Sequence, residues 1–419
     1  MAEQLFWLFI AVNTLMLVSN FFTPMGAFRY TFLTGCVNLT FVAPQLYAVM
    51  LYTHANSAYM SLSLVCMITC TLALWFGFNL GAKVRPNQPI TVHNVQYDKI
   101  IKTAALFCLV GLVAYMLNRG QYKGGKVSGT FVVIKFFANY INYSLVLVII
   151  ALSYPYKKYR DAYKFILFLL VLSALDLLVF QARRANAIYF FLIICYFWMI
   201  KLTPGMYKTV RYIIPAFFLV GMFSSTVIAQ YRQNSYEGKM SVGENIESMD
   251  LSNSREKLLN NENEINNAIL GINMVAASGQ YDWGGFNWNG IIRDYIPKSF
   301  IGASGKQGLM FNLSYSKYTG RLTATGKTMT GYFDAYASFG ILGFIKFLII
   351  GYIMGVLWRK KEHSQISLLL YFALLTAALH ILTHSTNNFF SGLVFYAVFV
   401  YPFLRYLPDR KKKIAFSQC

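Results

Sequence analysis

Charged residues are scarce in this chain, and acidic residues are the scarcest. Only 13% of the 419 residues are charged, and 37 Lys and Arg stand against 16 Asp and Glu, which gives a net charge of +21. Soluble domains carry about a quarter charged residues. Since 57% of the residues are hydrophobic and the mean hydropathy is +0.47, the composition excludes an ordinary soluble domain and predicts an all-α, polytopic integral membrane bundle.

Cysteine motifs are also missing. The chain has six cysteines, five of them inside apolar runs, with no CxxC pair and no Cys/His spacing typical of a metal site. Neither a disulfide framework nor a metal centre is therefore expected, and no cofactor is predicted. The stretch Gly320–Thr328 approaches a phosphate-binding loop, but it is one residue too long and follows no hydrophobic strand, which excludes a nucleotide site.

Basic residues lie in short clusters between apolar runs, so the charge excess indicates membrane topology and not nucleic-acid binding. The apolar runs predict about 11 transmembrane helices, and residues 5–22 are predicted to be a first span and not a cleavable signal peptide. The predicted spans are 5–22, 31–53, 58–81, 100–118, 130–153, 163–180, 186–202, 211–229, 332–357, 366–383 and 387–406.

The connections between these spans alternate in charge. One side has clusters such as Lys83-Val-Arg85 and Arg359-Lys-Lys361, and it is predicted to be cytoplasmic. The other side has the one large polar loop, and with an odd number of spans the N-terminus is expected there as well. This topology predicts a multi-pass protein of the bacterial inner membrane with the large loop on the periplasmic face.

The large loop, residues 231–330, contains nine of the sixteen acidic residues and ten of the 37 basic ones. It separates an N-terminal membrane bundle, 1–230, from the C-terminal membrane helices and basic tail, 331–419. Apolar residues within 256–274 recur near helical spacing and predict a surface helix, whereas 281–300 is expected to fold against the membrane interface. Because this loop is the one large polar segment outside the predicted spans, we expect the specific chemistry of the protein to lie there.

Two arginines end a predicted span on the outer side. Arg183 and Arg184 are costly at a membrane edge unless they reach the interface or bind an anion, and guanidinium groups bind phosphate in bidentate fashion. Asp176 lies seven residues earlier, so it can orient Arg183 or simply neutralise it. Interfacial placement without a ligand remains the alternative for both arginines.

Further bases follow within or just after the loop. Arg293, Lys298 and Lys306 lie in a turn-rich basic segment, and Arg321 and Lys327 follow it. All five are candidates to surround a diphosphate, and a solvated loop is the alternative for each.

The loop leads into a segment of small and aromatic residues that contains Asp334. This carboxylate can accept a proton from a sugar hydroxyl or stabilise the start of a helix. His384, four residues after His380, is a candidate general base or phosphate ligand, although a third metal ligand is missing. Trp283 and Trp288 can stack on sugar rings or form a small loop core.

Together these segments resemble the O-antigen polymerase (Wzy-type) family of oligosaccharide repeat-unit polymerases. The resemblance rests on many spans with one large late outer loop and on three motifs. These are Gln181-Ala-Arg-Arg184, then Ile296-Pro-Lys298 with Gly305-Lys306, and Thr330-Gly-Tyr-Phe-Asp-Ala-Tyr-Ala-Ser-Phe-Gly-Ile-Leu-Gly343. The last is similar to the family's T-x-x-G-E-A-Y-A-N-F-G-x-x-G stretch, with Asp334 in place of Glu.

This resemblance implies a glycosyltransferase that joins undecaprenyl-diphosphate-linked oligosaccharides by block transfer and releases undecaprenyl diphosphate. It implies membrane lipids, a flippase and a chain-length regulator as partners, and a product such as O-antigen or capsule. Arg183, Arg184, Arg293, Asp334 and His384 would then be catalytic, and the other candidates would bind substrate. The alternatives are a ligase that transfers the finished glycan, and a flippase or exporter that makes no bond.

Overall fold

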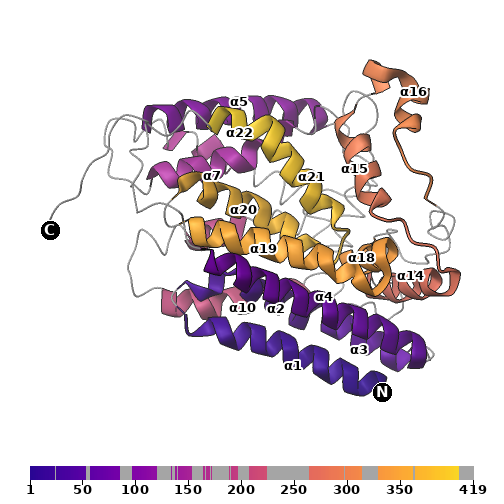
Figure 1. Cartoon of the computed structure of the whole chain (residues 1–419). Helices are drawn as coiled ribbons and strands as arrows, with labels where there is room; N and C mark the ends of the chain where they lie inside the picture. Colours follow the sequence, from indigo (N-terminus) through magenta and orange to yellow (C-terminus); the bar gives the residue numbers. More distant parts are fainter. Residues whose placement is uncertain are drawn as a thin grey trace, which may run out of the picture.

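The computed structural model of the chain is a bundle of apolar helices with a smaller group of helices attached at one end (Figure 1). The residues that the structure describes are 1–23, 25–52, 57–84, 97–119, 134, 137–138, 140–152, 164–165, 167–169, 171, 188, 190–196, 207–223, 264–296, 298–313, 329–361 and 364–404. No strand occurs among these residues, as the predicted all-α class requires.

Within this described part, 6 helices are long and apolar enough to cross a membrane. They are Ala2–Phe21, Tyr30–Leu51, Ala58–Lys83, Lys99–Leu117, Gly331–Lys360 and Asn387–Leu404, and Ile366–His380 is a shorter apolar helix. The helical membrane class is therefore confirmed, but the predicted count of about 11 spans is not. The predicted spans 163–180 and 186–202 lie largely outside the described residues.

The closest helix packing joins α4 (Ser57–Lys83) to α19 (Phe344–Lys360). Each helix presents two glycines four residues apart, Gly77 and Gly81 on α4 and Gly351 and Gly355 on α19. A Cβ added to any of them would lie only 2.2 or 2.3 Å from a backbone oxygen of the other helix. Glycine pairs at this spacing let two helix backbones approach in a membrane, where the hydrophobic effect does not drive association.

Helix α19 is preceded by a break that the sequence did not predict. The expected span 332–357 is divided into α18 (Gly331–Phe339), a 3₁₀ turn (Gly340–Gly343) and α19. Gly340 has φ +59, which a side chain would strain, and a Cβ on Gly343 would lie 2.0 Å from the Ala335 oxygen. The segment is a candidate span, as predicted, but it is not one continuous α-helix, because these glycines change the direction of the chain between α18 and α19.

The large loop, residues 231–330, is called the excursion from here on. Its described residues form three helices, α14 (Glu264–Ser278), α15 (Gly285–Tyr295) and α16 (Lys298–Gly308). Helix α14 is not a simple surface helix, because its isoleucines at 265, 269 and 272 are buried. It packs against α18 and α4, and α15 packs against α21 (Asn387–Phe395). The described helices of the excursion thus pack directly against the helices of the bundle (Figure 1).

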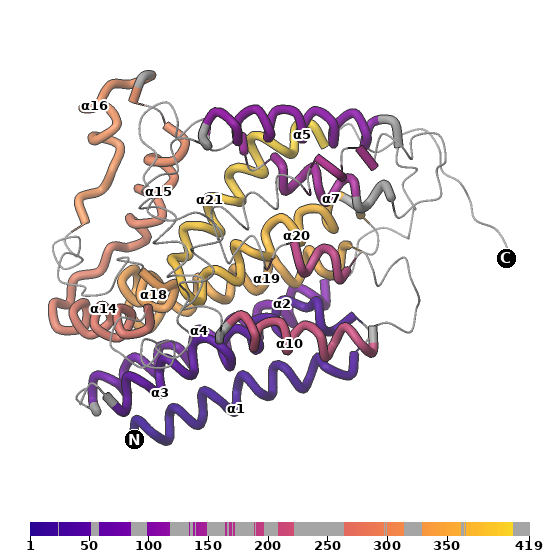
Figure 2. The backbone as a smooth tube through the Cα atoms, turned by 180° about the vertical axis from the view of Figure 1, so that it is seen from behind, coloured from indigo at the N-terminus to yellow at the C-terminus, as the bar shows by residue number. Residues whose placement is uncertain are grey.

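The two ends of the bundle differ in composition. The excursion, the N-terminus of α1 (Ala2–Phe21) and the turn between α20 (Gln365–His380) and α21 lie at one end (Figure 1). At the opposite end α19 finishes at Arg359 and Lys360, and the start of α10 (Tyr207–Phe223) lies beside the end of α1 (Figure 2). The N-terminus and the excursion therefore share one end, as expected from the number of predicted spans.

The glycine contact predicts that Gly351→Ala destabilises the bundle. The new Cβ would collide with the Leu74 oxygen, and overpacking of this kind typically costs about 1–3 kcal/mol. The apparent melting temperature of the purified protein in detergent measures the effect. Gly221→Ala in α10 is the control, because nothing lies within 4 Å of its added Cβ. Equal melting temperatures for the two variants would contradict the contact.

Candidate functional site

A buried polar cluster joins the excursion to the membrane helices. We call it the Lys346 network, and it consists of Asn287, Asp334, Ser338, Lys346 and Thr386. The Lys346 side chain is 7% exposed and the Asp334 side chain 0% exposed, and their charged atoms lie 3.0 Å apart. An ammonium inside an apolar helix is costly unless it is paired and hydrogen-bonded, and this pairing explains how α19 tolerates it.

All three donors of the Lys346 ammonium are used. They go to Asp334 Oδ1 at 3.0 Å, to Ser338 Oγ at 2.6 Å and to Asn287 Oδ1. Asp334 Oδ2 accepts from the Thr386 backbone N–H at 2.9 Å and from the Thr386 hydroxyl. Asn287 Nδ2 donates to Thr386 Oγ1 at 3.0 Å, which closes a ring of hydrogen bonds. The network thereby ties together α15, α18, α19 and the start of α21.

Asp334 has a structural role in the fold, because it holds Lys346 and Thr386 in place. Both carboxylate oxygens accept hydrogen bonds and the group is sealed from solvent, so it is a fixed anion that positions other groups. The helix cap is Thr330, whose hydroxyl accepts from the Phe333 N–H at 3.2 Å. Asp334 lies in the first turn that follows this cap.

The turn with the two histidines lies directly beside this network. The Gly331 N–H, at the start of α18, donates to the Ile381 oxygen at 2.8 Å, and His384 is two residues before Thr386. The imidazoles of His380 and His384 are stacked with centroids 3.8 Å apart, and His384 Nδ1 lies 2.9 Å from the Thr383 hydroxyl. Both rings are partly exposed, so His384 lies at the surface of the site.

Cations of the excursion lie on α15 and α16. The Arg293 side chain is 62% exposed and its Nε lies 3.4 Å from Asp294. Lys298 is exposed, whereas Lys306 is buried and donates to the Arg293 and Ile296 oxygens at 2.8 and 2.7 Å. Lys306 therefore caps the C-terminal end of α15, where free carbonyls favour a cation. Burial, with the nearby Lys298, lowers the pKa of Lys306.

The two tryptophans of the excursion have different surroundings. Trp283 is 74% exposed and its backbone N–H donates to the Ser338 oxygen at 3.1 Å. Trp288 is 45% exposed, and its indole N–H donates to the Leu309 oxygen at 2.8 Å. Neither indole is enclosed in a small loop core, which was one of the two alternatives for these residues.

The structure brings together only some of the predicted site residues. Asp334 and the His384 turn are adjacent, and Trp283 docks on the end of α18. Helix α15, which carries Arg293, reaches the network through Asn287, but the Arg293 guanidinium points to solvent and Asp294. The remaining candidates, Arg183, Arg184, Asp176, Arg321 and Lys327, lie outside the described residues.

Lys346 is the central residue that sequence reasoning did not assign. The signal was an ammonium within an apolar run with an acidic residue, Asp334, 12 positions before it. On one continuous helix two such positions do not face each other, and the break at Gly340 is what lets them meet. Asn287, Ser338 and Thr386 gave no sequence signal, because their roles depend on tertiary contacts.

The described helices define a helical integral membrane protein with a polar, partly helical excursion docked at one end of the bundle. Among the described residues, no group of three His, Cys, Asp or Glu is placed to hold a metal ion. Comparisons of the chain with protein-family models, curated proteins and solved structures find no match.

The network predicts that Lys346→Met lowers stability strongly. Removing one partner of a buried pair typically costs about 3–5 kcal/mol, because the other charge is left uncompensated. Asp334→Asn should be costly for the same reason, and the double variant should lose less than the sum of the two. Thermal unfolding in detergent measures this cycle, and Lys208→Met on the exposed start of α10 is the control. Strict additivity would mean that the two side chains do not interact.

Asp282 gives a pH-dependent prediction. Burial raises the pKa of its carboxyl above the ordinary 3.8, the Ser338 hydroxyl and Lys346 oppose the rise, and Asp334 adds to it. At neutral pH the charged Asp282 carboxylate therefore lowers the free energy of unfolding. This loss of stability disappears as the pH falls through the raised pKa towards 3.8, because the carboxyl then becomes neutral in the folded protein.

Asp282→Asn should accordingly raise the apparent melting temperature at pH 7, and this gain should shrink as the medium is made acidic. Melting curves across this pH range measure the effect, with Glu3→Gln at the exposed start of α1 as the control. A gain that grows on acidification would contradict the assignment.

Proposed function

We propose that this chain is a glycosyltransferase that polymerises undecaprenyl-diphosphate-linked oligosaccharide repeat units at the outer face of the bacterial inner membrane. The observation that carries the proposal is the docking of the polar excursion onto a broken helix. Lys346 in α19 reaches Asp334 in α18 and Asn287 in α15 at the same end of the bundle. A lipid-linked saccharide needs this combination, with apolar helices for its tail and a polar surface for its sugars.

The proposed orientation follows from the distribution of positive charge. The end opposite the excursion has described bases at Arg29, Lys83, Lys208, Arg359 and Lys360. Cytoplasmic connections are enriched in Lys and Arg. We therefore assign that end to the cytoplasm, which leaves the excursion and the N-terminus on the periplasmic side.

The proposed chemistry divides roles between cations and a base. As the bond from the donor's anomeric carbon to the diphosphate breaks, its electron pair leaves with the diphosphate, and cations there stabilise the developing charge. Arg293 and Lys298 are described candidates, and Arg183 and Arg184 are proposed to complete the set. His384 is proposed to take the proton of the acceptor hydroxyl, while Asp334 and Lys346 fix the turn that precedes α21.

Two alternatives share parts of this support. A ligase that transfers the finished glycan would need the same donor site and differs only in its acceptor. A flippase or exporter is favoured by one observation, the interrupted helix at Gly340, because transporters commonly place binding sites at such breaks. Product analysis separates the three functions.

The direct test adds lipid-linked repeat units to the purified protein and separates the products by size. Polymerisation gives a ladder, and Arg293→Ala should lower its rate about 10²–10³-fold, the usual effect of removing one donor to a developing anion. Arg293→Lys should recover part of the rate, because it restores the charge without the bidentate geometry.

The control for this test is Lys208→Ala at the opposite end of the bundle, which should leave the ladder unchanged. Unchanged repeat units that have crossed a vesicle membrane would support transport instead. A normal ladder from Arg293→Ala would contradict the proposed phosphate role.

A further inference from the structure

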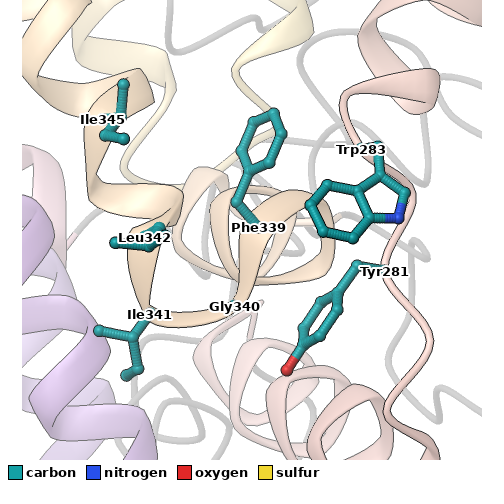
Figure 3. Close-up of a pocket in the computed structure, with 7 residues that line it drawn as sticks. All are labelled: Tyr281, Trp283, Phe339, Gly340, Ile341, Leu342 and Ile345. Carbon is teal, nitrogen blue, oxygen red and sulfur yellow. The ribbon is translucent and has the colours of Figure 1, made fainter.

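A hollow lies where the excursion meets the break between α18 and α19. It has a volume of about 320 Å³ and is lined by Tyr281, Trp283, Phe339, Gly340, Ile341, Leu342 and Ile345. Figure 3 shows the three aromatic side chains near Gly340, with the three aliphatic side chains following one another along the 3₁₀ turn and the start of α19. The hollow is therefore built jointly by the excursion and by a membrane helix.

The aromatic wall is held in place by the backbone. Trp283 has φ +52, a conformation that is uncommon for a bulky residue and requires support from neighbouring groups. The support comes from the Asp282 and Trp283 N–H groups, which donate to the Ala337 and Ser338 oxygens at 2.9 and 3.1 Å. The Trp283 ring consequently stands 6.2 Å from the Phe339 ring and 74% exposed.

The lining favours an aliphatic chain over a sugar. Its side chains are hydrocarbon except for the Tyr281 hydroxyl and the Trp283 indole N–H, whereas a saccharide would require several hydrogen-bonding groups. Leu342 is 59% exposed, and Ile341 and Ile345 are also exposed, within the apolar segment Gly331–Lys360. A chain can thus enter from the bilayer without leaving apolar surroundings.

Polar groups of the protein lie next to the hollow. The Phe339 ring is 5.9 Å from the Lys346 ammonium, so the hollow adjoins the Lys346 network. The excursion that supplies Trp283 also carries the exposed cations Arg293 and Lys298. A tail in the hollow therefore has the polar groups of the Lys346 network next to it.

We propose that this hollow binds part of the aliphatic tail of the lipid-linked saccharide, at the point where the tail joins its headgroup. This inference rests on the proposed function and adds to it a location for the lipid, on the lateral face of the α18–α19 break. It also changes the role expected of Trp283, from stacking on a sugar to forming the wall of a lipid site.

The test uses a polyprenyl phosphate that carries a photoreactive diazirine on its chain near the phosphate. The full-length protein is placed in phosphatidylcholine nanodiscs, irradiated with the probe, and mapped by peptide mass spectrometry. Labelling is expected within 281–283 or 339–345, and unlabelled polyprenyl phosphate should compete at least about tenfold better than phosphatidylglycerol. Trp283→Ala should weaken this labelling several-fold, whereas Trp7→Ala, which removes an exposed indole from α1, should not.

Two outcomes would overturn the proposal. One is labelling confined to other segments, and the other is equal competition by phosphatidylglycerol, which would make the hollow a general contact with bilayer lipid. The labelling needs no sugar transfer, so the two proposals fail separately. Labelled protein that makes no ladder contradicts the polymerase, and a normal ladder without labelling of the hollow contradicts the lipid site.

Discussion

The fold at the excursion end depends on the buried ion pair between Lys346 and Asp334. In an apolar interior a charged side chain is tolerated only when its partners are in place, and here the members of the network come from four different elements. Asp334 and Ser338 lie on α18, Lys346 on α19, Asn287 on the excursion and Thr386 at the start of α21. The cost of burying the ammonium is offset in this arrangement of the four elements, so the network holds the excursion in its docked position.

Glycines make that arrangement possible in two ways, by a close helix contact and by a turn. The Gly77–Gly81 and Gly351–Gly355 pairs bring α4 and α19 into backbone contact, and this fixes the helix that carries Lys346. Gly340 then turns the chain between α18 and α19, so that Asp334 comes back to face Lys346. The same turn leaves a hollow beside Phe339, so the proposed lipid site and the polar network are two consequences of one break in a helix.

Sequence reasoning succeeded where the physical signal was local. The apolar runs predicted the membrane class, and the number of predicted spans placed the N-terminus at the same end as the excursion. It predicted the apolar segment at 332–357 but not its interruption at Gly340, because hydropathy alone cannot distinguish a continuous helix from one interrupted at glycine. It also failed at Lys346, whose role depends on a partner that a continuous helix would place on another face. Lys306, predicted to bind substrate, is engaged in capping α15, a role that only the fold of the excursion reveals.

The sequence by itself determined that this chain forms apolar helices with one large polar excursion and an excess of positive charge at one end. These properties follow from composition and spacing, since each apolar segment must satisfy its own backbone in lipid. Only the tertiary structure decided which polar side chains share a site, because Asn287, Asp334, Lys346 and Thr386 are far apart along the chain. Their association depends on the low polarity of the interior, which makes an unpaired charge costly and therefore favours a packing in which every donor of Lys346 finds an acceptor.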